Sequence, residues 1–203
     1  MSSATPPAPA ARPRPAAAWL AFSAAMTAQV PAIAGRADLT VIVAPGAGRG
    51  APACFLPATA EIEVNGDHLP VDPATANPAS PADRERYPAL WGATMHECAH
   101  AAHSRWRAPE GTSAAWSAAA TALEESRIEA RQVTRRPADR AWLRACTCQI
   151  VIGDFTAAAA PPASAAEAGS AAALILARED AGILETAEAE PVAHAVAAVI
   201  GEE

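Results

Sequence analysis

Short stretches with strand-like patterning come first in this chain, and longer helical patterns follow. Residues 39–43 form a largely β-branched run that ends near a Pro-Gly pair, and residues 59–64 alternate polar and apolar positions with a period of two. A short apolar run at 54–56 lies between these two predicted strands. Strands that precede a series of helices indicate an α+β domain with a small N-terminal sheet, rather than a parallel doubly wound domain.

One helix is predicted before the strands and several after them. The first covers about residues 16–29 and is ended by Pro31. Ser113 is suited to cap the start of the longest later helix. The later helices are predicted at 88–106, 114–133, 138–152, 174–184 and 192–200. The tryptophans on them are expected in the core: Trp91, Trp106, Trp116 and Trp142.

These patterns divide the chain into four parts. Residues 1–15 are Pro, Ala, Ser, Thr and Arg after the initial Met, and they are expected to form a disordered leader. Residues 16–155 hold all the strands and the main helices, and are expected to form one domain. Residues 156–171 are rich in Ala, Pro and Ser and are expected to be a linker. Residues 172–203 are predicted as C-terminal helices that pack on the domain or continue it in truncated form.

The net charge of -7 argues against a nucleic-acid partner, which would favour a basic face. The four cysteines do not form the framework of a small secreted protein, since two are in a Cys-x-Cys pair that cannot easily bridge to itself. A reducing, cytoplasmic location is therefore expected. No membrane partner is expected either, because no uninterrupted apolar stretch approaches the required length of about 20 residues.

The N-terminus offers an alternative to the cytoplasmic location. Arg12 and Arg14 precede an apolar run, and residues 32–34 resemble a cleavage site, so residues 1–34 could act as a secretory signal peptide. Against this, the run is interrupted by Ser23 and is mostly alanine. Its larger apolar side chains can instead pack as one side of an amphipathic helix.

The sequence His96-Glu97-Cys98-Ala99-His100 is a His-Glu-x-x-His motif within a predicted helix. Residues four apart lie one above the other on a helix, so His96 and His100 can aim ring nitrogens at one Zn²⁺ ion. Glu97 lies about 100° round the helix from His96, beside the metal position, where its carboxylate can take a proton from a water molecule. The alternative is a pair of surface histidines without a metal.

A catalytic zinc site needs a third protein ligand. Glu125 and Glu129 are four residues apart on one face of the next predicted helix, where two carboxylates require a cationic partner. Glu125 is therefore the expected ligand, and Glu129 is expected to hydrogen-bond a ligand histidine. Glu124 is the less favoured alternative for the metal, because it lies nearer to Arg127 and suits a surface ion pair.

His103 shares the face of His96 and His100, but seven helical residues place it about 10 Å along the axis from His96. A polar role beside the site, such as a hydrogen bond to a ligand, is expected rather than metal ligation. The predicted strand at 59–64 could be the sheet edge that binds an extended peptide beside the metal helix.

These motifs resemble those of zincin metallopeptidases of the gluzincin type. The resemblance covers residues 38–135 and rests on His96-Glu97-x-x-His100 with Glu125-x-x-x-Glu129, where that group usually has Glu-x-x-x-Asp. The segments HECAHAAHSRW and LEESRIEAR are more specifically similar to metallopeptidase domains of bacterial and phage proteins that often accompany von Willebrand A-type domains. A similar helix pair occurs in accessory subunits of the cobalt chelatase.

The resemblance implies a zincin-like fold and a zinc-dependent peptidase that acts on a peptide or protein substrate, with Glu97 as the general base. The alternative is a non-catalytic zincin-fold module that binds a protein partner, as the chelatase-like and von Willebrand-associated relatives suggest. Active gluzincins also carry a His, Tyr or Arg that stabilises the oxyanion. Candidates for that role here are Tyr87, His103, Arg105 and His194.

Overall fold

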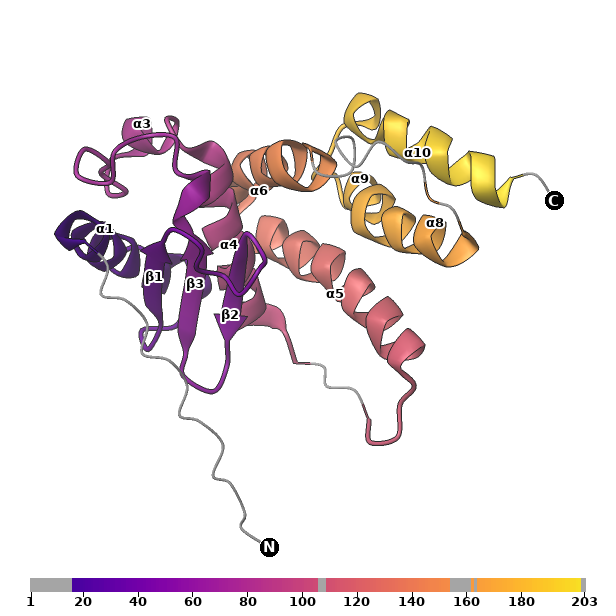
Figure 1. Ribbon diagram of the computed structural model, residues 1–203, viewed down its shortest axis with the longest axis horizontal. Helices are drawn as coiled ribbons and strands as arrows, with labels where there is room; N and C mark the ends of the chain where they lie inside the picture. Colours follow the sequence, from indigo (N-terminus) through magenta and orange to yellow (C-terminus); the bar gives the residue numbers. More distant parts are fainter. Residues whose placement is uncertain (1–15, 106–108, 154–161, 163, 202–203) are drawn as a thin grey trace, which may run out of the picture.

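The computed structural model describes residues 16–105, 109–153, 162 and 164–201. The predicted leader at 1–15 and Trp106 lie outside these residues. The protein is an α+β structure, mostly helical, with one small three-stranded sheet (Figure 1). This confirms the expected α+β class and the small sheet that precedes the main helices.

The sheet contains β1 (Thr40–Ala44), β2 (Ala53–Leu56) and β3 (Glu61–Asn65) in the order β1-β3-β2. β3 runs parallel to β1 and antiparallel to β2. The strand predicted at 59–64 is therefore central, and the idea that it forms a peptide-binding edge is wrong. Both edges of β3 are hydrogen-bonded to neighbouring strands, and the pairing with β1 joins residues that are distant in sequence.

The outer edge of β1 is covered by α1 (Ala17–Thr27). The Ser23 hydroxyl accepts a hydrogen bond from the Val43 amide at 2.9 Å, and the Thr27 hydroxyl accepts one from the Val41 amide at 2.9 Å. Each hydroxyl also donates to the carbonyl of the same strand residue. Two hydroxyls one helical turn apart thus match alternate residues of the strand, and they satisfy backbone groups that an exposed edge would leave free.

After α1, the chain continues into the short helix α2 (Val30–Ala34). The apolar face predicted for this region is present, because Phe22, Met26 and Val30 are buried in the core. By length and composition alone, Ala17–Ala34 is nevertheless apolar and long enough to cross a membrane, contrary to the expectation from the sequence. The location of the protein stays a prediction.

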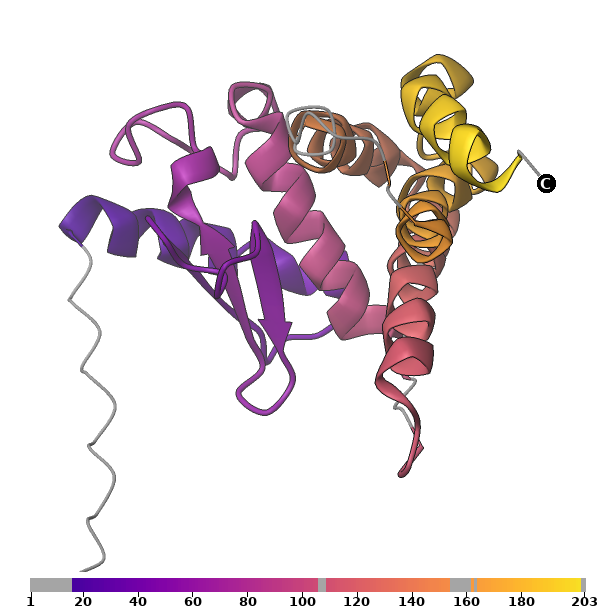
Figure 2. The ribbon, with the colours of Figure 1, turned by 45° about the vertical axis from the view of Figure 1, so that its right-hand side comes forward.

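The helix α4 (Pro88–His103) lies between the sheet and α5 (Ala114–Arg135), as Figure 2 shows. Its first half is buried, and it packs closely on α6 (Arg140–Cys146). A methyl group at Gly92 would overlap the backbone carbonyl of Trp142. The glycine therefore permits the close crossing of these two helices, which sets the direction of the second half of α4.

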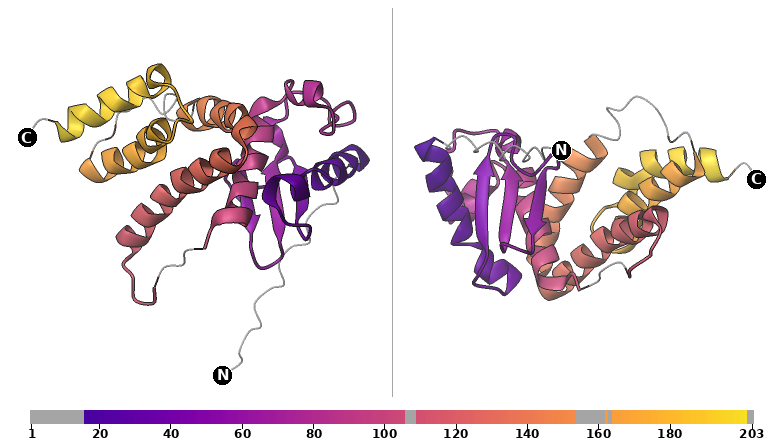
Figure 3. Two further views of the ribbon diagram at one scale, coloured as in Figure 1. Left: turned by 180° about the vertical axis from the view of Figure 1, so that it is seen from behind. Right: turned by 60° about the horizontal axis from the view of Figure 1, so that its bottom comes forward.

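The C-terminal helices form a second apolar cluster beside α5, at the end of the molecule away from α1 (Figures 1 and 3). The predicted linker at 156–171 differs from the structure in its last part, since residues 165–171 are helical and Ser164 caps them. The helix predicted at 174–184 begins earlier and contains a π-helical stretch. The elements here are α8 (Ala165–Ala171), η4 (Ala172–Leu176), α9 (Ala177–Asp180) and α10 (Thr186–Ile200).

The remaining elements are short. They are η1 (Gly66–His68), α3 (Pro81–Arg84), η2 (Pro137–Asp139) and the π-helical η3 (Thr147–Ile152). Of the tryptophans that were expected in the core, Trp91 is buried and Trp142 packs against the core. Trp116 is 51% exposed, so the expectation is wrong there. It lies in the first turns of α5, which extend beyond the body of the protein (Figure 1).

Candidate metal centre

Three of the side chains predicted as metal ligands meet at one point. One ligand atom from each of His96, His100 and Glu125 lies within 4.8 Å of the others. The Nε2 atoms of His96 and His100 are 2.8 Å and 3.4 Å from Oε2 of Glu125. Among the residues that the structure describes, this is the group of His, Cys, Asp and Glu side chains that could hold a metal ion.

Two helices supply this cluster. His96 and His100 are one turn apart on α4, and their rings meet edge to face with centroids 4.8 Å apart. Glu125 lies in the middle of α5 and contacts both histidines. The contacts of Glu125 with the two histidines therefore depend on the packing of α5 against α4. No local sequence pattern specifies this packing.

His96 is held by a carboxylate on each side of its ring. Nδ1 lies 2.7 Å from Oε1 of Glu129, and Nε2 lies 2.8 Å from Oε2 of Glu125. Burial alone would lower the pKa of His96, but the hydrogen bonds to Glu125 and Glu129 raise it to about 10. Without a metal, His96 is thus an imidazolium that donates from both nitrogens.

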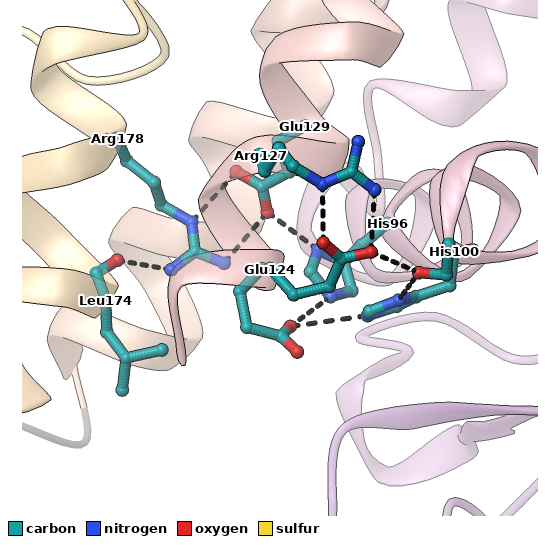
Figure 4. Close-up of polar contacts among 9 residues, drawn as sticks. His96, His100, Glu124, Arg127, Glu129, Leu174 and Arg178 are labelled. Carbon is teal, nitrogen blue, oxygen red and sulfur yellow. Dashed lines mark hydrogen bonds and ion pairs between the residues drawn. The ribbon is translucent and has the colours of Figure 1, made fainter. Parts of the chain in front are cut away.

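Glu129 in turn is paired with Arg178, a residue of α9 that no sequence pattern singled out. Nε and Nη2 of Arg178 donate to the two carboxylate oxygens of Glu129 at 2.8 and 3.0 Å (Figure 4). Both side chains are almost fully buried, at 3% and 2% exposure. Burial would raise the pKa of Glu129, but Arg178 and His96 hold it below its usual range. The carboxylate therefore stays ionised behind His96.

A second contact fixes the same C-terminal segment to α5. The Ser126 hydroxyl donates to the backbone carbonyl of Ala173 at 2.9 Å, within the π-helical η4. Arg178 also donates through Nη1 to the carbonyl of Leu174. The segment that carries Arg178 is thus bonded to α5 one residue after Glu125. The C-terminal helices, which lie outside the stretch that resembles zincins, take part in building the site.

His100 has a different set of partners, which lie nearer the surface. Its Nδ1 is 2.9 Å from the Ser104 hydroxyl, and that hydroxyl is 2.9 Å from Oε1 of Glu124. Nη2 of Arg127 donates to the same Glu124 oxygen at 2.7 Å (Figure 4). Glu124 therefore makes the ion pair that was predicted for it, and its carboxylate points at Ser104 and Arg127.

Glu97 lies at the inner wall of a cleft that opens beside the three candidate ligands. The cleft has a volume of about 1290 Å³, and it is lined by β2, α4, α5, η3 and residues of η4 and α9. Burial raises the pKa of Glu97, while the two ligand histidines and the backbone amide of Phe55 on β2 act in the opposite direction. A carboxyl whose pKa lies above its ordinary value is suited to exchange protons near neutral pH.

Two imidazole nitrogens and a carboxylate oxygen form a donor set that could hold a metal ion, and their spacing can be compared with that of a tetrahedral zinc site. Bonds of 2.0–2.2 Å in tetrahedral geometry require ligand atoms about 3.4 Å apart. The His100–Glu125 distance already matches this value, and the His96–Glu125 distance is shorter by about half an ångström, as expected where a proton joins the two atoms. Both remaining Nδ1 atoms have hydrogen-bond partners, which orients the rings. One position would remain open toward the cleft.

The other polar residues selected from the sequence lie elsewhere, with one exception. His103 contacts Oε1 of Gln132 at 3.1 Å and has no hydrogen bond to the three candidate ligands. The Tyr87 hydroxyl donates to Asp83 at 3.2 Å, away from the cleft. His194 lies on α10 and does not line the cleft, whereas Arg105 does.

The fold and the site together define an α+β protein in which three side chains that could hold a metal ion line a cleft. Comparison with protein-family models, curated proteins and solved structures finds no match for the chain. The resemblance to zincins therefore rests on the sequence motifs alone.

Proposed function

We propose that this protein is a zinc-dependent hydrolase of the metallopeptidase type that cleaves a peptide or protein substrate. The observation that carries the proposal is the meeting of His96, His100 and Glu125 within 4.8 Å, beside a cleft that also contains Glu97. Two imidazoles and a carboxylate are ligands that favour zinc over calcium or magnesium. When bound, zinc would polarise a substrate carbonyl and lower the pKa of a water molecule.

Glu97 is the proton carrier in this proposal. Its carboxylate accepts a proton from the attacking water and passes it to the leaving amine. The first half of this step needs an ionised group, and the second needs an acid. A buried carboxyl with a raised pKa, close to two histidines that oppose the rise, can serve in both states.

The edge of β2 that faces away from β3 is the proposed substrate-binding edge, in place of the central β3. Since α1 covers β1, β2 offers the remaining edge of this sheet among the described residues. Residues 53–55 of this strand line the cleft together with Glu97. An extended peptide could add to this edge through main-chain hydrogen bonds, which would bring a carbonyl group to the metal.

The first test is metal content by mass spectrometry on purified protein, with Glu97→Gln and Glu125→Ala beside the wild type. We expect one zinc per chain in the wild type and in Glu97→Gln, and loss of zinc in Glu125→Ala. Peptide hydrolysis should then fall about 10²–10⁴-fold in Glu97→Gln, because only proton transfer is removed. Absence of bound metal after zinc has been supplied would end the hydrolase proposal.

Hydrolysis separates this proposal from the alternative of a non-catalytic module that holds a protein partner. A wild-type protein that keeps one zinc, yet cleaves no member of a broad peptide library at a rate that Glu97→Gln reduces, would favour the alternative. The same mutant is the matched control in both experiments, because its side chain has almost the same shape and lacks only the ionisable oxygen.

A further inference from the structure

Ser104 occupies a defined position directly after α4, as the residue that ends this helix. Its backbone amide donates to the carbonyl of His100 at 3.0 Å, so the last helical turn fixes its place. From there its hydroxyl lies between two polar groups, with 2.9 Å to Nδ1 of His100 and 2.9 Å to Oε1 of Glu124. The serine thus connects a candidate metal ligand to a carboxylate on the neighbouring helix.

The hydroxyl has one proton, and its neighbours determine where that proton goes. An ionised carboxylate can only accept hydrogen bonds, so the Ser104 hydroxyl donates to Glu124. Arg127 favours this ionised state, because its guanidinium donates hydrogen bonds to both oxygens of Glu124. The Ser104 oxygen is then left as an acceptor toward His100. Nδ1 of His100 must therefore carry the ring proton.

A neutral imidazole has one N–H group, so a proton on Nδ1 leaves the lone pair on Nε2. Nε2 of His100 is the atom that faces Oε2 of Glu125 at 3.4 Å and belongs to the cluster. The Glu125 carboxylate draws a proton to Nε2, and the chain from Arg127 through Glu124 to Ser104 acts against this by favouring the tautomer that can bind a metal. Glu129 likewise accepts from Nδ1 of His96, but from a buried position.

We propose that Ser104 is a positioning residue for the metal centre, which holds His100 with its Nε2 lone pair directed at the metal. This inference rests on the proposed function, since it assigns a role in the same site. It also assigns Glu124 a purpose beyond a surface ion pair. Without the hydroxyl, the ring proton of His100 moves from Nδ1 to Nε2. The Nε2–H group then donates to Glu125, and its proton competes with the metal for this nitrogen.

The hydrogen bonds of Ser104 lie near the surface, so its hydroxyl can be removed without loss of the fold. Ser104 is exposed, and its side chain contributes to no apolar cluster. Ser104→Ala is therefore expected to fold normally and to change only the ring of His100. Ser104→Thr retains the hydroxyl, and the extended backbone at this position suits a β-branched residue. Ser170→Ala is a matched control, because that exposed hydroxyl bonds only to a backbone carbonyl of its own helix.

The first readout is the protonation of the His100 ring in metal-free protein, measured by long-range ¹H–¹⁵N NMR in a buffer alkaline enough that ordinary imidazoles are neutral. The His100 signals are assigned by their loss in His100→Gln. We expect a protonated Nδ1 in the wild type, in Ser104→Thr and in Ser170→Ala. In Ser104→Ala, the protonated nitrogen should be Nε2.

The second readout is zinc affinity, measured by competition with a chromophoric chelator. Ser104→Ala should bind zinc about tenfold more weakly, at the lower end of the effect of losing a partner of a ligand histidine. Ser104→Thr and Ser170→Ala should stay within about twofold of the wild type. Glu124→Gln should also weaken zinc binding, since an amide N–H can donate to the Ser104 oxygen. The serine hydroxyl could then donate to Nδ1 of His100, which would leave the ring proton on Nε2.

The proposal is overturned if Ser104→Ala keeps the proton on Nδ1, or if it changes the tautomer and leaves zinc affinity unchanged. These failures differ from failure of the proposed function. A wild-type protein that binds no zinc would remove the metal centre, whereas the NMR measurement on metal-free protein would still decide whether Ser104 controls the His100 ring.

Discussion

The ion pair between Glu129 and Arg178 offers the sharpest test of how the C-terminal helices support the site. Arg178→Met removes the guanidinium and retains much of the length and apolar bulk of the side chain. Glu129 would remain 2% exposed with only His96 as a cationic partner. Breaking a buried pair by removing one partner costs about 3–5 kcal/mol, and we expect the lower end because His96 stays. A loss of about 3 kcal/mol is a large part of the 5–15 kcal/mol typical of a domain.

The assay is urea unfolding of metal-free protein, followed by tryptophan fluorescence in the presence of a chelator. Arg144→Met is the control, because Arg144 also pairs with two glutamates of the C-terminal segment but its side chain is 37% exposed. The free energy of unfolding should therefore fall by about 1 kcal/mol or less. The double variant Arg178→Met/Glu129→Gln removes the unpaired charge, and it should be more stable than the sum of the two single losses predicts by about 2 kcal/mol. Additive losses, or a cost below about 1 kcal/mol for Arg178→Met, would refute the argument.

Two further predictions follow from the same structure. Zinc binding should release about one proton near neutral pH, because the pKa of His96 is raised to about 10 and its Nε2 proton must leave; calorimetry in buffers of different ionisation enthalpy measures this release. Because its pKa is raised, His96 contributes its full stabilisation of the metal-free fold below its ordinary pKa, and this contribution is lost as the pH rises toward 10. Zinc affinity should increase over the same pH range. No buffer dependence would show that His96 is already neutral. Gly92→Ala should destabilise the protein by about 3 kcal/mol or more in thermal or urea unfolding, since its methyl group would overlap the Trp142 carbonyl, whereas Gly169→Ala, at a helical glycine with open space, should be neutral or slightly stabilising.

The sequence was informative about features that depend on local geometry. The spacing of His96 and His100 places them on one face of any regular helix, and the same holds for Glu125 and Glu129. The alternation at 59–64 likewise predicts a strand, which the structure contains as β3. Backbone periodicity determines each of these features, so a few neighbouring residues are enough to predict them.

Other features required residues that are far apart in the chain. Which strand is the free edge depends on the order β1-β3-β2, and alternation within one strand carries no information about its neighbours. Trp116 is exposed although it lies on an Ala-rich helix, because the first turns of α5 extend past the body. Ser104 could have been noticed four residues after His100, at i and i+4, but the carboxylate that gives its hydroxyl a direction comes from another helix.

Arg178 illustrates the division most clearly. The candidate ligands and the need for a cation near two buried carboxylates could be predicted from the sequence, because helix periodicity and the cost of burying charge are general. It could not determine that an arginine 49 residues beyond Glu129 supplies this cation in addition to His96. This pair depends on long-range packing, since it forms when the C-terminal helices bury their apolar faces beside α5. Burial of that kind is a property of the whole packed chain.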